Sequence, residues 1–211
     1  MTARVLAPDE IPQGDALFLF VAMIAGTTDG VLPLTVGARG EPTTRTFPTR
    51  DHTRRIAHAI EHLSVAHDVH VAVAPRVKVK TPRRGVWRHE IVAVHCLWVS
   101  CEENRWSALQ AFAPAPSVIV HYRGRLDSYW QLRSPLSRAE AVRANRRLAH
   151  ALGGDMDATD PTWEARPPGT QSFKFTPAAK VECIRIRLDP FTAEEIVGAL
   201  SDPPCERAEA A

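Results

Sequence analysis

The hydrophobic residues of this chain occur mainly in short runs that are separated by polar turns. A β-branched run at residues 117–122 stops at a polar segment with Gly124, and a second apolar run follows at residues 126–132. Two such runs around a turn predict a β-hairpin. Another apolar run, at residues 91–99, predicts a buried strand that ends at the polar residues 100–103. We expect the polar site of the protein where this strand ends beside the hairpin.

Two other stretches have the apolar spacing or the end signals of helices. Residues 51–67 carry apolar side chains at the i, i+3, i+4, i+7 spacing of one helical face. Ser137 and Glu140 predict a capping box at the start of a second helix, which should end at Gly153. The apolar stretch at residues 17–25 fits either a buried helix or a buried strand.

Other apolar or alternating stretches predict extended segments at residues 31–36, 69–73, 173–175 and 181–188. A phase slip at Cys183 predicts a β-bulge in the last of these. The sequence contains no internal repeat and no clear linker. We therefore predict a single domain at residues 15–200, with a loose arm at residues 1–14 and a disordered tail at residues 201–211.

A basic segment follows the predicted strand at residues 69–73. Arg76, Lys78 and Lys80 alternate, so they share one face of an extended strand, and Arg83 and Arg84 follow in a turn. A basic ribbon of this kind suits the phosphate backbone of single-stranded DNA. It is also typical of a solvated edge strand that lysine protects from aggregation. The net charge of +2 does not decide between these interpretations.

The cysteines and the apolar runs indicate a cytoplasmic protein with no membrane contact. The four cysteines show no CxxC spacing, which favours reduced structural thiols. The longest apolar stretch is too short to span a bilayer.

Several common catalytic motifs are absent, namely the P-loop, GxGxxG and GxSxG. What remains is a set of acidic residues near the predicted strand ends: Glu102, Glu103, Asp127 and Asp160. Carboxylate oxygens are suitable ligands for Mg²⁺ or Mn²⁺. Two such ions could drive nucleotidyl transfer.

The order and spacing of several short stretches resemble the RepB-like branch of the archaeo-eukaryotic primase superfamily, the primase-polymerases of plasmids, phages and mobile elements. The resemblance covers roughly residues 15–175. The matching stretches are residues 69–76, 97–102, 116–120, 124–130 and 148–155, then Asp160 and residues 166–174. The resemblance implies an α+β fold: an RRM-like antiparallel or mixed sheet with flanking helices, joined to a small N-terminal α/β unit.

The motifs of that family are altered in this chain. Its first motif, Asp-x-Asp, holds the catalytic metals, and here those places hold Ser100 and Glu102. Its second motif, Ser-Gly-x-Gly-x-His, contacts the nucleotide phosphates, and here Tyr122 replaces the Ser and Asp127 the His. Its third motif supplies another metal-binding Asp, which Asp160 matches.

A later signature, Arg-x-Pro-Gly-Thr-x-Asn-x-Lys, survives at Arg166, Gly169, Thr170 and Lys174, with Ser172 in place of Asn. The resemblance thus implies that one group of residues faces a nucleotide: Tyr122, Arg123, Arg125, Arg166 and Lys174. It assigns catalysis and metal binding, if the site is active, to Glu102, Asp127 and Asp160 with Mg²⁺ or Mn²⁺.

The changes should weaken metal and nucleotide binding. Ser100 removes a charged ligand, and Glu102 moves its oxygens by about one methylene from the geometry that Mg²⁺ demands. Asp127 places an anion near the triphosphate, although Arg123 and Arg125 offer phosphate contacts that could offset it.

We interpret the chain as a primase-polymerase-like protein that binds single-stranded DNA or primer-template and nucleoside triphosphates, with catalysis weakened or lost. Three alternatives stay open. One is an active enzyme with a rebuilt metal site, and another is a scaffold that recruits a replicative helicase or a polymerase. The third is a hairpin kept only for folding.

Overall fold

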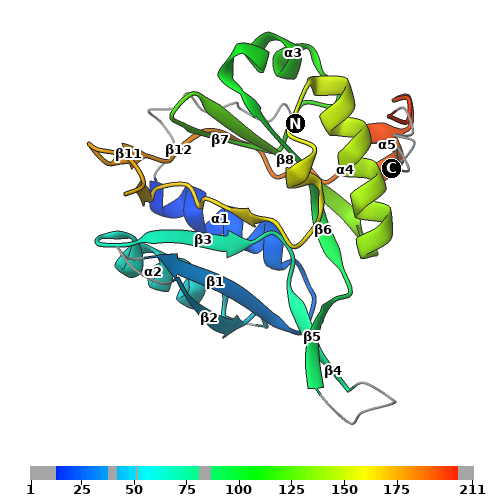
Figure 1. Cartoon of the computed structure of the whole chain (residues 1–211). Helices are drawn as coiled ribbons and strands as arrows, with labels where there is room; N and C mark the ends of the chain where they lie inside the picture. Colours follow the sequence, from blue (N-terminus) through cyan, green and yellow to red (C-terminus); the bar gives the residue numbers. More distant parts are fainter. Residues whose placement is uncertain (1–12, 38–41, 51, 81–86, 204–211) are drawn as a thin grey trace, which may run out of the picture.

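The structure is a computed structural model that describes residues 13–37, 42–50, 52–80 and 87–203 (Figure 1). The predicted arm and tail lie almost entirely outside these residues. The helices are α1 (Gln13–Ala25), α2 (Thr53–Ser64), α3 (Trp106–Ala111), α4 (Arg138–Leu152) and α5 (Ala193–Val197). The main strands are β1 (Val31–Gly37), β2 (Thr43–Pro48), β3 (Asp68–Ala72), β4 (Arg76–Lys80), β5 (Trp87–Ile91), β6 (Val94–Glu102), β7 (Val118–Tyr122), β8 (Arg125–Leu136) and β12 (Glu182–Ile186). Short strands are β9 (Glu164–Ala165), β10 (Gln171–Ser172) and β11 (Ala179–Lys180).

The N-terminal sheet has the order β5-β4-β1-β3-β9, with β2 paired to the side of β1. Helix α2 packs on β3 and on α1. Its buried face includes Ile56, Ile60 and Leu63, as the helical spacing predicts. The ambiguous stretch at residues 17–25 is the buried part of helix α1, which lies between the two sheets (Figure 1).

The C-terminal sheet has the order β12-β7-β8-β6, and every pair in it is antiparallel. The chain passes through β6, α3, β7, β8, α4 and β12 in that order. Helix α1 contacts this sheet, and Phe20 meets Tyr129 of β8 edge to face at a centroid distance of 5.1 Å. The predicted α+β fold with an antiparallel sheet is confirmed.

The hairpin of β7 and β8 turns through two residues, Arg123 and Gly124, both with positive φ. A two-residue turn of this hand matches the twist of paired strands and favours glycine. The pairing that it sets places Asp127 opposite Ser100 on β6 and Val120 on β7. Residues directly opposite one another in a sheet share a face, so this register decides which side chains meet.

Local end signals were predicted correctly. Ser137 caps α4 in a reciprocal capping box with Glu140, and Gly153 ends the helix at φ 66°. The strand β12 has the predicted irregularity, between Cys183 and Arg185.

Two predictions of extended structure were wrong in detail. The apolar run at residues 91–99 is divided, because Ile91 ends β5 and β6 begins at Val94. Residues 173–175 lie in a turn, since the backbone N–H of Phe173 donates to the side chain of Asp68.

None of the helices in the described segments is long and apolar enough to cross a membrane. Cys96, Cys101 and Cys183 are free and buried, whereas Cys205 lies outside the described residues.

Candidate functional site

The polar face of the C-terminal sheet lies at the ends of β6, β7 and β8. The register pairs Glu102 with Arg125 and Ser100 with Asp127, and Tyr122 also pairs with Arg125. All five side chains therefore project from one face, because directly opposed residues and residues two apart on a strand share it. The structure thus brings together the predicted hairpin residues and the predicted strand end.

Asp127 is fully buried, with 1% of its surface exposed. Burial raises the pKa of its carboxyl to about 6, and the nearby Ser100 hydroxyl and Arg125 guanidinium offset part of the rise. The hydroxyls of Ser100 and Tyr122 lie close to it, yet neither carboxylate oxygen accepts a well-aligned hydrogen bond from the described residues. A buried carboxylate without hydrogen-bond donors costs folding free energy, so the nearby cations have to stabilise its charge.

The Arg125 guanidinium links two groups at this site. Its Nη2 donates to the Ser100 hydroxyl at 2.9 Å and to an Asp155 carboxylate oxygen at 3.3 Å. Asp155 is held there by its backbone N–H, which donates to the Ser100 carbonyl at 2.8 Å. Asp155 was not predicted as a site residue, although it ends the matched stretch at residues 148–155. The sequence feature that could have identified Asp155 is the glycine end of α4, because the chain turns there and returns to the end of β6.

The other two predicted metal ligands have hydrogen-bond partners of their own. Glu102 is exposed and accepts a hydrogen bond from the Asn104 side-chain amide at 3.1 Å. Asp160 accepts two hydrogen bonds from Arg138, at 3.0 and 2.9 Å, and one from the backbone N–H of Thr162. These hydrogen bonds outweigh desolvation and lower the pKa of Asp160.

The carboxylates of the described residues do not fit a divalent metal site. No three His, Cys, Asp or Glu side chains within these segments are grouped to hold a metal ion. Mg²⁺ requires near-octahedral oxygen ligands. Here the positive charge between Ser100 and Asp155 is already supplied by the Arg125 guanidinium.

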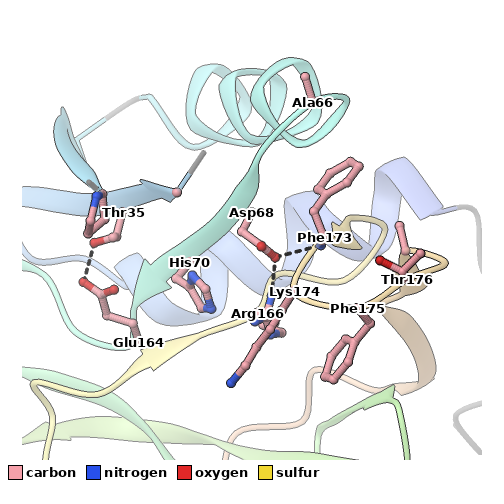
Figure 2. A pocket seen from close by; sticks show the side chains of 13 residues that line it. Thr35, Ala66, Asp68, His70, Glu164, Arg166, Phe173, Lys174, Phe175 and Thr176 are labelled. Carbon is pink, nitrogen blue, oxygen red and sulfur yellow. Dashed lines mark hydrogen bonds and ion pairs between the residues drawn. The ribbon is translucent and has the colours of Figure 1, made fainter. Parts of the chain in front are cut away.

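A larger cavity of about 910 Å³ lies between the N-terminal sheet and the segment after β9 (Figure 2). Asp68 on β3 accepts a hydrogen bond from Arg166 at 2.9 Å and another from the Phe173 backbone at 3.0 Å. This pairing fixes the turn that carries Lys174, which also lines the cavity. The Arg166 guanidinium in turn lies 5.6 Å from the ring centre of Tyr122, so this cavity adjoins the sheet face.

His70 lines the same cavity and is mostly buried. Its pKa is lowered to about 4, chiefly by burial and then by the charges of Arg166 and Lys174, with Asp68 opposing. The imidazole is therefore neutral at pH 7. At the rim, the Arg123 guanidinium stacks over the Phe175 ring at 4.2 Å, so the hairpin turn contacts the segment after β10.

The basic ribbon is the two-stranded extension formed by β4 and β5 (Figure 1). Arg76 lies opposite Ile91 and Lys78 opposite His89, so they share a face as predicted. Arg76 and Arg138 also line one cavity, of about 450 Å³. Lys80 ends β4, but its side chain lies outside the description, and so do Arg83 and Arg84.

Neither a protein-family model nor a curated protein matches the chain. Solved structures resemble it at 14% sequence identity. The archaeo-eukaryotic primase domain of the cyanophage S-2L primase-polymerase has a TM-score of 0.61, with 89% of this chain and 97% of that chain covered. Primase RepB′ has a TM-score of 0.62, with 86% of this chain and 59% of that chain covered.

The catalytic domain of primase RepB′, solved in complex with initiator DNA, has a TM-score of 0.58. The alignment covers 85% of this chain and 89% of that chain. At 14% sequence identity, this structural similarity establishes the fold of the chain alone. The chain has the fold of RepB-like primase-polymerases.

Proposed function

We propose that this protein is a primase-polymerase-like protein that serves the replication of a plasmid, a phage or another mobile element. It binds single-stranded or primed DNA and nucleoside triphosphates, and its catalysis is weakened or lost. The shared fold supports the primase-like role. One of the similar structures is a primase domain in complex with initiator DNA, which supports the binding of DNA.

The observation that carries the loss of catalysis is the position of Arg125. Its guanidinium donates to Ser100 and to Asp155, two side chains that line the end of β6. A fixed cation between these oxygens opposes a second, divalent cation by direct repulsion. Asp160, expected as a ligand, is committed to Arg138 instead. Mg²⁺ or Mn²⁺ belongs to the function only if the enzyme is active.

The DNA-binding part of the proposal rests on cations at two places, of which Lys78, Arg123 and Lys174 are exposed and Arg76 is partly exposed. Arg76 and Lys78 lie on the β4 ribbon, and Arg123 and Lys174 lie around the larger cavity. Lysine and arginine that follow a groove bind a nucleic-acid backbone with little sequence preference. The candidate protein partner is a replicative helicase.

Primer extension on a primed single-stranded template, in Mg²⁺ and separately in Mn²⁺, tests the proposal. We expect the protein to bind the template and to extend the primer at most in trace amounts. Extension that Asp127→Asn and Asp155→Asn both abolish would establish an active enzyme with a rebuilt site. A protein that neither binds the template nor extends it would refute the proposed function.

A further inference from the structure

A separate small cavity lies at the end of β6, beside the sheet face. It has a volume of about 330 Å³, and its lining includes Ser100, Glu102, Arg105, Arg125 and Asp155. Two of these side chains are arginines from different elements: Arg105 ends the turn of 3-10 helix after β6, and Arg125 begins β8. A cavity of this size holds one phosphate group together with neighbouring water.

Arg125 retains free hydrogen-bond donors that face solvent. A guanidinium has five N–H donors, and the two on Nη2 supply the bonds to Ser100 and Asp155. The donors on Nε and Nη1 have no hydrogen-bond partner among the residues that the structure describes. The side chain is 38% exposed, so these donors can reach a ligand. Parallel N–H groups of this kind bind phosphate oxygens in a bidentate manner.

Arg105 lines the same cavity beside the end of helix α4. Gly153 makes room for it, because a Cβ added to Gly153 would lie 2.8 Å from the Arg105 Cζ atom. The C-terminus of a helix favours a cation, since its last carbonyl groups carry partial negative charge. The Arg105 side chain forms neither a hydrogen bond nor an ion pair with any other described residue. A second guanidinium thus lines the cavity, and unlike Arg125 it has no ion-pair partner among the described residues.

The two carboxylates in the lining are already engaged. Asp155 is paired with Arg125, and Glu102 accepts the hydrogen bond from Asn104. They reduce the positive charge of the cavity but leave the outer donors of both arginines available. The site differs in this respect from a metal centre, where free carboxylates would be required.

We propose that this cavity binds a phosphate group through Arg105 and Arg125, so that a nucleoside triphosphate is held without a divalent cation. This inference rests on the proposed binding of nucleotides and changes its cofactor requirement. Arg125 supplies the charge that a metal ion would otherwise bring to the phosphates. The shared ligand chemistry is a phosphate, which a nucleotide or a DNA strand could provide.

Isothermal titration of the full chain with dATP, first in EDTA and then in MgCl₂, tests the inference. We expect binding in EDTA that Mg²⁺ does not strengthen. Arg105→Ala and Arg125→Ala should each weaken binding by about tenfold or more, because each removes charge-assisted hydrogen bonds. Arg125→Lys keeps the charge, loses the planar fork and should fall between. Arg143→Ala is the matched control, since Arg143 is exposed on α4 and removes the same charge.

Titration with a short oligo(dT) identifies the source of the phosphate. If the variants lose oligo(dT) affinity and not dATP affinity, the cavity binds the DNA backbone. Binding of dATP only after Mg²⁺ or Mn²⁺ is added would overturn the inference, and so would equal losses in Arg143→Ala. Normal oligo(dT) binding by all variants with no dATP binding overturns the inference and leaves the DNA-binding proposal intact. If the unchanged protein binds neither dATP nor oligo(dT), both proposals are overturned.

Discussion

Arg166 and Asp68 form an ion pair at 2.9 Å that fastens the segment after β9 to strand β3. Both side chains are largely buried, with 11% and 20% of their surface exposed. The same Asp68 oxygen accepts the backbone N–H of Phe173, so one carboxylate fixes both the arginine and the turn that carries Lys174.

Asp68→Ala should lower the free energy of unfolding by about 2–3 kcal/mol, because it leaves a mostly buried cation and a backbone N–H without their acceptor. Denaturant unfolding measures this change. Asp29→Ala is the matched control: its pair with Arg50 has side chains that are 73% and 74% exposed, and exposed pairs contribute little. Equal losses in the two variants would contradict a structural role for the Asp68 pair.

His70 should make the stability depend on pH in the acidic range. Its pKa is about 4 when folded and 6.5 in an unfolded chain, so the unfolded state takes up the proton first. The contribution is complete above pH 6.5 and is lost as the pH falls toward 4. The loss should be about 1–3 kcal/mol, less than the full shift implies because the ring is partly exposed.

His70→Gln removes the titrating group and should flatten the stability curve between pH 6.5 and 4. Denaturant unfolding at several pH values checks this. An NMR titration of the His70 ring provides the direct readout, and a midpoint above pH 6 would show that Arg166 and burial do not act on it as the structure indicates.

Asn145 on α4 closes the free edge of β6. Its side chain is fully buried, accepts from the Trp98 backbone N–H at 3.0 Å and donates to the Thr159 carbonyl at 3.2 Å. Asn145→Leu should cost about 2–4 kcal/mol of unfolding free energy, because both backbone groups lose their partner in a buried place. Thermal unfolding measures the loss.

Asn104→Leu is the control for Asn145→Leu. Asn104 is exposed, and Glu102 is the one partner of its amide among the described residues, so water can replace the contact. We expect a change below about 0.5 kcal/mol. A small effect at both positions would mean that the edge of β6 does not depend on the α4 side chain.

Elements with local signals could be predicted from the sequence. The capping box at Ser137, the stop at Gly153 and the turn at Gly124 each depend on residues within one turn of chain. The break before Val94 and the turn at Phe173 could not be predicted, because they depend on distant partners. For Phe173 that partner is Asp68, 105 residues away in the chain.

The candidate site was predicted only in part, because some of its contacts also join residues that are distant in the sequence. Motif matching found the residues on the shared sheet face, because strand register follows from a hairpin and its neighbour. It did not show which acidic residue after α4 returns to β6: Asp160 matches the motif, whereas Asp155 contacts Arg125. In the stretch matched to Ser-Gly-x-Gly-x-His, Arg125 stands at the second glycine. Only the structure indicates that its guanidinium reaches Ser100.

The two interpretations of the β4 ribbon predict different results for the double variant Arg76→Ala, Lys78→Ala. If the ribbon binds DNA, affinity for single-stranded DNA should fall, and the slope of log K against log salt should become shallower by about 1.4, since each phosphate contact contributes about 0.7. Fluorescence anisotropy across a salt series measures both quantities. If the ribbon instead protects a sheet edge, DNA affinity should not change and the variant should aggregate more readily. Arg143→Ala with Arg146→Ala removes the same charge from the exposed face of α4 and serves as the control. An equal change of slope in this control would show that net charge, and not the ribbon, governs binding.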